Sequence, residues 1–277
     1  MRNLLKSSLL LLAGSLSLSA WGAMSPDADS TAEGSLPPVW GLATSHGIET
    51  VPAPPAIVPR MAPELALQSF QQRAARQLDE PVSYSANTVV EAELPDTSQK
   101  GEYRLRRRFI APRTLLFTPV HFVGDNFVKS NVIARLLQAE VDHASKGESA
   151  RTAITEANYK FSYKGLDEID GRRVHVFHVK PRGRQPGLFK GRIYLDASSG
   201  SLRRAEGTLV KTQSFFVKRV EFVQDYADID GYTLPVHARS LARTRLLGRA
   251  VVEIATDGYD LTSTTASAAT PAAGGSQ

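Results

Sequence analysis

The sequence of 277 residues contains no cysteine. Disulfide bonds, thiolate metal sites and catalysis by a thiol are therefore excluded. Long apolar runs are missing as well, because the stretch at Leu9–Leu12 and Leu16 is far shorter than the ~20 residues that a bilayer-spanning helix needs. What the chain does contain is 42% hydrophobic residues, enough to bury the core of a globular domain.

The first residues have the pattern of a secretory signal peptide. Arg2 and Lys6 precede the apolar stretch, and the small residues Ala20 and Gly22 form a cleavage site. We therefore expect residues 1–22 to be a signal peptide and the protein to be exported. An uncleaved N-terminal anchor is the alternative.

Two further segments lack the periodicity of helices and strands. Residues 23–62 are rich in Pro, Ser, Ala and Gly, which predicts a disordered linker that serves either as a tether or only as a leader. Residues 263–277 are uncharged and low in complexity, which predicts a disordered tail. One domain remains, at residues 63–262.

The net charge of +5 at pH 7 narrows the choice of partners. A basic domain suits anionic lipid head groups, an acidic partner or nucleic acid. Nucleic acid is not expected as a partner, because the chain is expected to be exported and contains no recognisable nucleic-acid-binding motif.

Two stretches have the 3.6-residue period of amphipathic helices. The first covers residues 64–80, begins after Pro63 and ends before Pro81. The second lies in residues 125–145, with Asp125 as its N-cap and Leu136 in its apolar stripe. Because strands flank this second helix, we expect either a lid over the concave face of a sheet or a helix packed there permanently.

The stretch GEYRLRRRFIAP has the period of a strand, so its side chains alternate between two faces. Arg104, Arg106 and Arg108 fall on one face and form a basic stripe, which is either a solvated surface or a membrane-surface contact. Arg107 falls on the other face together with Phe109. A buried guanidinium is costly unless paired, so Arg107 should meet a carboxylate or the negative group of a ligand.

The chain from Asn158 onward reads as consecutive strands. Tyr159, Phe161 and Tyr163 share one face, where core packing and ligand stacking are both open. The Ser-Ser-Gly-Ser stretch after Asp196 lacks the strand–turn–helix context of a nucleophile elbow, so we interpret it as a hairpin. His175 and His178 are three apart on a strand and face opposite sides, so they cannot jointly hold a metal.

These elements predict a mainly β (α+β) domain with a single long, curled antiparallel sheet. Closely spaced strands joined by tight turns are antiparallel neighbours. One face of such a sheet is solvated, while the other is apolar and must be covered by helices or by a hydrophobic guest.

The hairpin motif resembles one family. Leu195, Asp196, Gly200, Leu202 and Arg204 match the LD-x-x-x-G-x-L-x-R hairpin of the periplasmic lipoprotein-carrier superfamily. This superfamily comprises LolA-like, LppX-like and RseB/MucB N-terminal domains, and the chain is most similar to bacterial envelope proteins related to outer-membrane lipoprotein sorting. The resemblance covers about residues 64–261.

The resemblance implies an unclosed half-barrel whose concave face is covered by helices and binds acyl chains or a hydrophobic peptide. It implies no enzyme, and we expect no cofactor and no metal. We therefore expect a monomeric periplasmic binding protein for the acyl chains of a lipid or lipoprotein. The alternative is an envelope sensor or scaffold that binds a protein partner through the half-barrel and its basic stripe. The expected ligand-binding residues are Tyr103, Leu105, Arg107, Phe109, Phe117, Leu136, Tyr159, Phe161 and Tyr163, with the helix around Leu136 displaced and Arg107 at the polar end of the ligand.

Overall fold

The computed structural model describes residues 60–212, 217–245 and 248–262. The predicted signal peptide, the predicted linker up to residue 59 and the predicted tail lie outside these residues.

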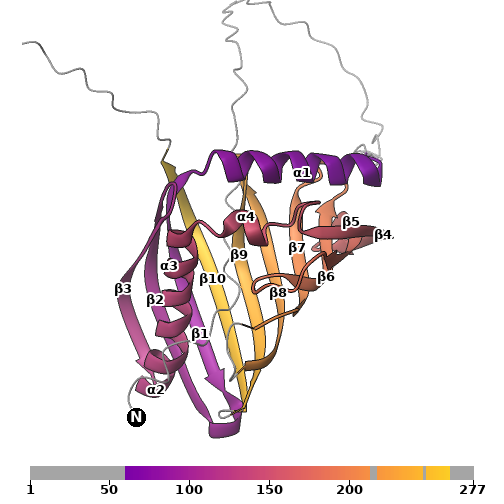
Figure 1. Cartoon of the computed structure of the whole chain (residues 1–277). Coiled ribbons are helices and arrows are strands. Elements are labelled where there is room, and N and C mark those ends of the chain that lie inside the picture. Colours follow the sequence, from indigo (N-terminus) through magenta and orange to yellow (C-terminus); the bar gives the residue numbers. More distant parts are fainter. Residues whose placement is uncertain (1–59, 213–216, 246–247, 263–277) are drawn as a thin grey trace, which may run out of the picture. The chain divides into compact units, whose positions relative to one another are not determined.

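The described residues form one antiparallel sheet in the strand order β3-β2-β1-β10-β9-β8-β7-β6-β5-β4 (Figure 1). The sheet does not close, so β3 and β4 are its two edges. The prediction of a single unclosed antiparallel sheet with few helices is confirmed. The strands are β1 (Ser83–Leu94), β2 (Gln99–Ile110), β3 (Thr114–Gly124), β4 (Tyr159–Ile169), β5 (Arg172–Pro181), β6 (Phe189–Asp196), β7 (Leu202–Leu209), β8 (Val217–Ile229), β9 (Tyr232–Thr244) and β10 (Arg249–Thr262).

Most strand pairs in this order follow one another along the chain and are joined by tight turns. The exception is the pair of β1 and β10, the first and last strands, whose register runs from Ser83 opposite Thr262 to Glu93 opposite Val251. This long-range pairing places the first and last strands side by side in the interior of the sheet.

Helix α1 (Pro63–Asp79) corresponds to the first predicted helix and lies across the strand ends (Figure 1). It begins at Pro63 because proline already has helical φ and needs no hydrogen-bond partner for its nitrogen. Its buried face packs through Phe70 and Ala74 against Phe177, Phe189 and other core residues of β4–β8. None of the helices in the described residues is long and apolar enough to span a membrane.

The second predicted helix is a continuous run of α2 (Asn126–Val128), η2 (Lys129–Ile133) and α3 (Ala134–Lys146), where η2 is a turn of π-helix. Asp125 stands at the N-cap position, but its carboxylate accepts a hydrogen bond from the backbone N–H of Lys100 instead of capping the helix. The run ends at Gly147, which has the left-handed conformation that a helix terminus commonly requires. The short helices η1 (Pro95–Thr97) and α4 (Ser149–Thr152) lie in connections.

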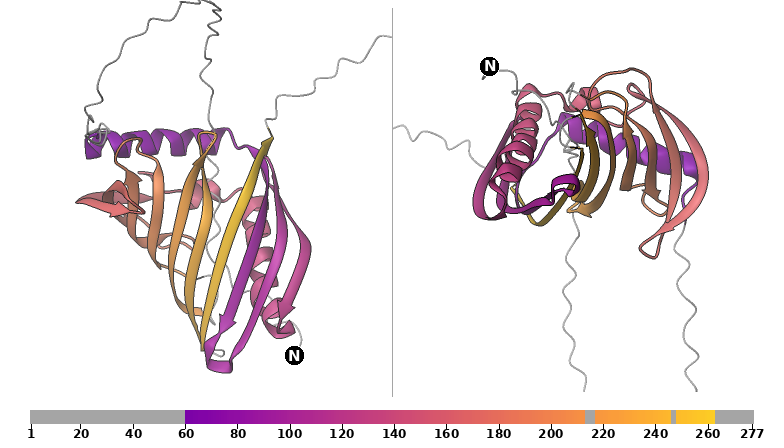
Figure 2. Two further views of the ribbon diagram at one scale, coloured as in Figure 1. Left: turned by 180° about the vertical axis from the view of Figure 1, so that it is seen from behind. Right: turned by 90° about the horizontal axis from the view of Figure 1, so that it is seen from below.

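Helix α3 lies on the inner side of the curl formed by β1–β3 (Figure 2). Its apolar stripe packs with strand residues into a second core cluster, distinct from the cluster under α1. The two main cores therefore lie one under each long helix, and two smaller clusters of buried residues accompany them. The members contributed by η2 and α3 are Val132, Ile133, Leu136 and Leu137, and those of β1, β2 and β10 include Val90, Leu105 and Val252.

Candidate functional site

The inner face of β2 carries a charged residue among apolar ones. On this strand Leu105, Arg107 and Phe109 are buried while Arg104, Arg106 and Arg108 are exposed, as the period of two predicts. Arg107 is 3% exposed. The predicted inward orientation of Arg107 therefore holds, and the basic stripe lies on the outer face.

The partner of Arg107 comes from the helix above it. Its Nη1 donates to Oε2 of Glu140 on α3 at 2.7 Å, and both side chains are almost completely buried. Its Nε donates to the hydroxyl of Tyr84 on β1 at 3.1 Å, and the guanidinium lies 5.5 Å from the centre of the Phe117 ring. The sequence predicted either a carboxylate or the negative group of a ligand beside Arg107, and the structure places the carboxylate of Glu140 there.

One nitrogen of Arg107 has no partner. Within the part of the chain that the structure describes, the buried Nη2 makes no hydrogen bond. A buried donor left without an acceptor costs free energy, since it gives up its bonds to water without compensation. The guanidinium therefore has one N–H donor left for a further negative or accepting group.

The protonation of this pair follows from its burial. Burial by itself would lower the pKa of Arg107, but the Tyr84 hydroxyl and the Glu140 carboxylate raise it, so the guanidinium keeps its charge. Burial raises the pKa of Glu140, and the charge of Arg107 opposes that rise. A positive charge thus sits permanently between the helix and the sheet.

A second polar contact ties the helical run to the same strands. The ammonium of Lys129 in η2 lies 5.3 Å from the ring centre of Tyr103 and 4.8 Å from that of Phe122 on β3. The two rings pack edge to face at 5.5 Å. The helical run is therefore held at two places by cations, at Lys129 of the run itself and at Glu140 by Arg107 of the sheet.

The space between α3 and the sheet is filled by side chains. A cavity of about 10 Å³ remains beside Leu136, lined also by Phe222 and Ser240. Such a volume holds about one water molecule. An acyl chain therefore fits on this face only if α3 moves.

The structure brings some of the predicted ligand-binding residues together and separates others. Leu105, Arg107, Phe109 and Leu136 are buried under the helical run, and Tyr103 and Phe117 are half-buried beside it. Tyr159, Phe161 and Tyr163 lie on β4, at the opposite end of the sheet. The predicted residues therefore line two regions, not one.

The aromatic residues of β4 belong to the core under α1. Tyr159 is fully buried, packs on Phe189 at 5.4 Å and accepts a hydrogen bond from the Phe189 N–H. Phe161 is half-buried against the same core, and Tyr163 remains 41% exposed at the sheet edge. For Tyr159, core packing is the role that the structure shows.

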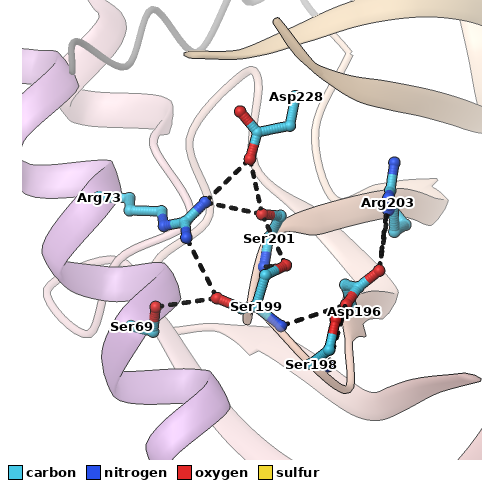
Figure 3. A network of polar contacts seen from close by, with 8 residues as sticks. All are labelled: Ser69, Arg73, Asp196, Ser198, Ser199, Ser201, Arg203 and Asp228. Carbon is cyan, nitrogen blue, oxygen red and sulfur yellow. Dashed lines mark hydrogen bonds and ion pairs between the residues drawn. The ribbon is translucent and has the colours of Figure 1, made fainter. Parts of the chain in front are cut away.

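The Ser-Ser-Gly-Ser stretch connects β6 and β7 and forms part of the platform for α1 (Figure 3). Arg73 of α1 donates to the hydroxyl of Ser201, the carbonyl of Ser199 and the carboxylate of Asp228. Ser69 of α1 donates to the same carbonyl. The stretch is a hairpin, as predicted, and its serines position a helix.

The carboxylate of Asp196 organises the hairpin itself (Figure 3). It accepts hydrogen bonds from the backbone N–H groups of Ser198 and Ser199 and pairs with Arg203 at 3.3 Å. Burial would raise the pKa of Asp196, but these hydrogen bonds and the charge of Arg203 hold it below its ordinary value. This aspartate belongs to the motif that suggested the family, and its role here is to shape the turn.

The two histidines of β5 point in opposite directions. His175 faces inward, where its ring nitrogens contact the Tyr163 hydroxyl and the carbonyl of Met61, just before α1. His178 faces outward beside Arg192 of β6. This geometry agrees with the expectation that the two histidines cannot jointly hold a metal.

Sequence reasoning missed Glu140 and Tyr84. A signal for Glu140 was present, since a glutamate stands four residues after Leu136 on the apolar stripe of the helix, where a charge needs a partner. No comparable signal marked Tyr84. The alternation of β1 shows on which face of the sheet Tyr84 lies, but it does not show which residue Tyr84 contacts.

Comparisons with known proteins find one family model and several solved structures that are similar to this chain. Residues 153–257 match the model of a family of unknown function, DUF5686. The match covers most of β4–β10 and leaves out β2, β3 and α3, where Arg107 and Glu140 lie. A comparison with the curated proteins finds no relative.

Several solved structures are similar to this chain at low sequence identity. The LolA superfamily protein NE2245 from Nitrosomonas europaea is 13% identical, with 72% of this chain and 93% of that chain covered and a TM-score of 0.38. An outer membrane lipoprotein-sorting protein domain from Vibrio parahaemolyticus is 14% identical over 73% and 94%, with a TM-score of 0.39. The MucA/MucB complex of Pseudomonas aeruginosa is also similar, at 11% identity over 69% and 92% and a TM-score of 0.21.

Proposed function

We propose that this protein is a monomeric, non-catalytic binding protein of the periplasm that holds the acyl chains of a lipid or lipoprotein under α3. The observation that carries the proposal is Arg107, a buried permanent cation with a free nitrogen on an apolar sheet face. A fatty ligand with a phosphate or ester end offers both an apolar body for the sheet and an acceptor for this nitrogen.

In this proposal α3 is a lid, and Glu140 occupies the place of the ligand's polar end while the site is empty. The lid must leave, because the space beneath it is filled. Each CH₂ that enters from water contributes about 0.8 kcal/mol, so a long acyl chain can replace the apolar contacts of the helix. The π-helical turn η2 interrupts the helical run, and such turns occur frequently at functional sites.

Of the predicted ligand-binding residues, those of β2, β3 and α3 line this site, namely Tyr103, Leu105, Arg107, Phe109, Phe117 and Leu136. Tyr159 and Phe161 form the separate core under α1 and are not part of the proposed site.

The test is native mass spectrometry of the protein after export in a bacterial host, followed by extraction and identification of bound lipid. A stoichiometric lipid is expected for the wild type. Glu140→Gln should increase lipid retention, because it removes the internal competitor for Arg107. Arg107→Leu/Glu140→Leu should abolish retention, because it removes the cation but leaves an apolar core.

The double variant keeps the test independent of folding, since exchange of a whole buried ion pair for apolar residues is often neutral or stabilising. Arg106→Leu on the outer face of the same strand is the matched control and should retain lipid. Retention by all variants would remove Arg107 from the proposal, and a wild type without any lipid would overturn it.

A second candidate function is a sensor or scaffold that binds a protein partner. The observation that favours it is the basic stripe, since Arg106 and Arg108 are exposed and form no ion pair with the described residues. Capture of a partner by the lipid-free protein, lost in Arg106→Glu/Arg108→Glu and at high salt, would support this function.

A further inference from the structure

A cluster of positive charge lies at the other end of the sheet from the basic stripe, on the outer face of β4, β5 and β6. Lys160 of β4 lies directly opposite Lys180 of β5. Continuation of the β5–β6 register, in which Val179 faces Gly191, brings Lys190 next to Lys180. We call Lys160, Lys180 and Lys190 the lysine row.

These lysines point away from the core. Their neighbours along each strand, Tyr159, Val179 and Phe189, belong to the cluster under α1, and side chains of a strand alternate between faces. All three lysines are exposed, and none pairs with a carboxylate among the residues that the structure describes. The row is therefore an uncompensated line of charge on the surface.

Further cations surround the row. His178 lies on β5, which also carries Lys180. Burial lowers the pKa of this histidine, and the charges of Lys190, Lys164, Arg192 and Lys180 lower it further. A depressed histidine pKa is what a positive local potential produces. Of these cations Arg192 is paired, with Glu206 at 2.6 Å.

The loops at the same strand ends extend the positive surface. A hollow of about 480 Å³ lies at the 182–188 loop between β5 and β6. It is lined by Ala157, Asn158, Arg182, Gly183, Arg184, Gln185 and Leu188. Arg182 donates to the carbonyl oxygen of Glu156 at 2.7 Å and is thereby held in place. Arginine is well suited to phosphate oxygens.

Like charges directly opposite each other on neighbouring strands destabilise a sheet. The fold tolerates this cost at Lys160 and Lys180 and collects more cations beside them. We propose that the outer face of β4–β6 is a docking surface for a bilayer that carries anionic phospholipid, bound by the lysine row and the arginines of the 182–188 loop.

The chemistry of the row favours a bilayer over an acidic protein. Lysine is depleted at protein–protein interfaces but supports binding to the diffuse charge of a membrane.

The test measures binding of the full chain to vesicles of phosphatidylglycerol mixed with phosphatidylcholine, by co-sedimentation at low and high salt. Lys180→Gln/Lys190→Gln is expected to lower the partition coefficient by about 25-fold, since each lysine near an anionic surface contributes roughly fivefold. Vesicles of phosphatidylcholine alone should bind wild type and variant equally.

The matched control is Arg106→Gln/Arg108→Gln, which removes the same charge from exposed, outward-facing positions of β2. It should lose far less binding. Equal losses from the two pairs would mean that net charge alone acts, and no loss from the lysine pair would exclude this surface; either result overturns the proposal. Inorganic phosphate, added at the same concentration of negative charge as the vesicles carry, should not displace the protein. Displacement would also overturn the proposal, in favour of a site for small anions.

This inference does not depend on a ligand under α3. The lysine row and Arg107 lie on opposite faces and at opposite ends of the sheet, so each test leaves the other site intact.

Discussion

The guanidinium of Arg107 and the carboxylate of Glu140 lie 2.7 Å apart with side-chain exposures of only 4% and 3%. Their contact joins α3 to the middle of β2. Because both groups are buried, the effect of removing one should differ sharply from the effect of removing both.

We expect Arg107→Leu alone to lower the free energy of unfolding by about 3–5 kcal/mol, since it leaves Glu140 buried without its partner. Arg107→Leu/Glu140→Leu should recover most of this loss. Urea unfolding of the two variants and the wild type measures both. Equal destabilisation by the single and double variants would show that the contact is not a coupled pair.

Three glutamates lie side by side on the outer face of the sheet. Glu91 of β1 stands opposite Glu102 of β2 on one side and Glu253 of β10 on the other. Glu102 is paired with Arg104 and Glu253 contacts His237, but Glu91 has no ion pair among the described residues. Glu91→Lys should therefore stabilise the fold by roughly 0.5–1 kcal/mol, because opposite charges across strands attract.

The control for this effect is salt. If charge repulsion is the cause, the gain in unfolding free energy should shrink at high ionic strength, where exposed charges are screened. A gain that is independent of salt would point to strand propensity instead.

Gly200 in the β6–β7 hairpin supports α1 by its lack of a side chain. It has φ +71°, and a Cβ there would lie 2.7 Å from the carbonyl oxygen of Ala66. Gly171 has nearly the same φ, +72°, but open space around it. Gly171→Ala should cost about 1–2 kcal/mol from backbone strain alone, and Gly200→Ala clearly more, because α1 must also shift.

Thermal unfolding of the two variants separates these contributions. Equal losses of stability would mean that α1 accommodates the methyl group and that the close approach is not required.

His143 on α3 makes stability depend on pH. Burial lowers the pKa of His143 below its ordinary value of about 6.5, although the neighbouring Glu148 works in the other direction. The folded state therefore binds the proton less readily than the unfolded chain does. Stability should be full above pH ~6.5 and fall as the pH drops below that value.

His143→Gln should reduce this fall, measured as the free energy of unfolding on either side of pH 6.5. His178 also has a lowered pKa and adds a change of the same sign, so His178→Gln is the control that separates the two. A wild type without loss of stability over this range would contradict the prediction.

Local patterns predicted the faces of strands but not their partners. The alternation along β2 placed Arg107 inward and the other three arginines outward, because side-chain direction depends only on the period of the strand. It could not name Glu140, which lies 33 residues away and meets Arg107 only through the docking of a helix. The same limit applies to Tyr84.

The division of the apolar face into two cores was also beyond local reasoning. Tyr159 and Leu105 look alike as inward residues of strands, yet they belong to different clusters because β4 and β2 lie near opposite ends of the sheet order. Strand order depends on which sequence-distant strands pair, and no short stretch contains that information. The signal peptide, the linker and the tail remain predictions.

The pairing of β1 with β10 bears on how the domain folds. Arg249–Thr262 fills a central position in the sheet, between the first strand and β9. Folds dominated by such sequence-distant contacts form slowly, because a long loop must close before the contacts are made. A nascent chain that lacks its last strand thus cannot join β1 to β9, so the complete sheet forms only after synthesis has reached the end of the domain. Such a delay would suit the export that we propose, in which the polypeptide crosses a membrane before it folds.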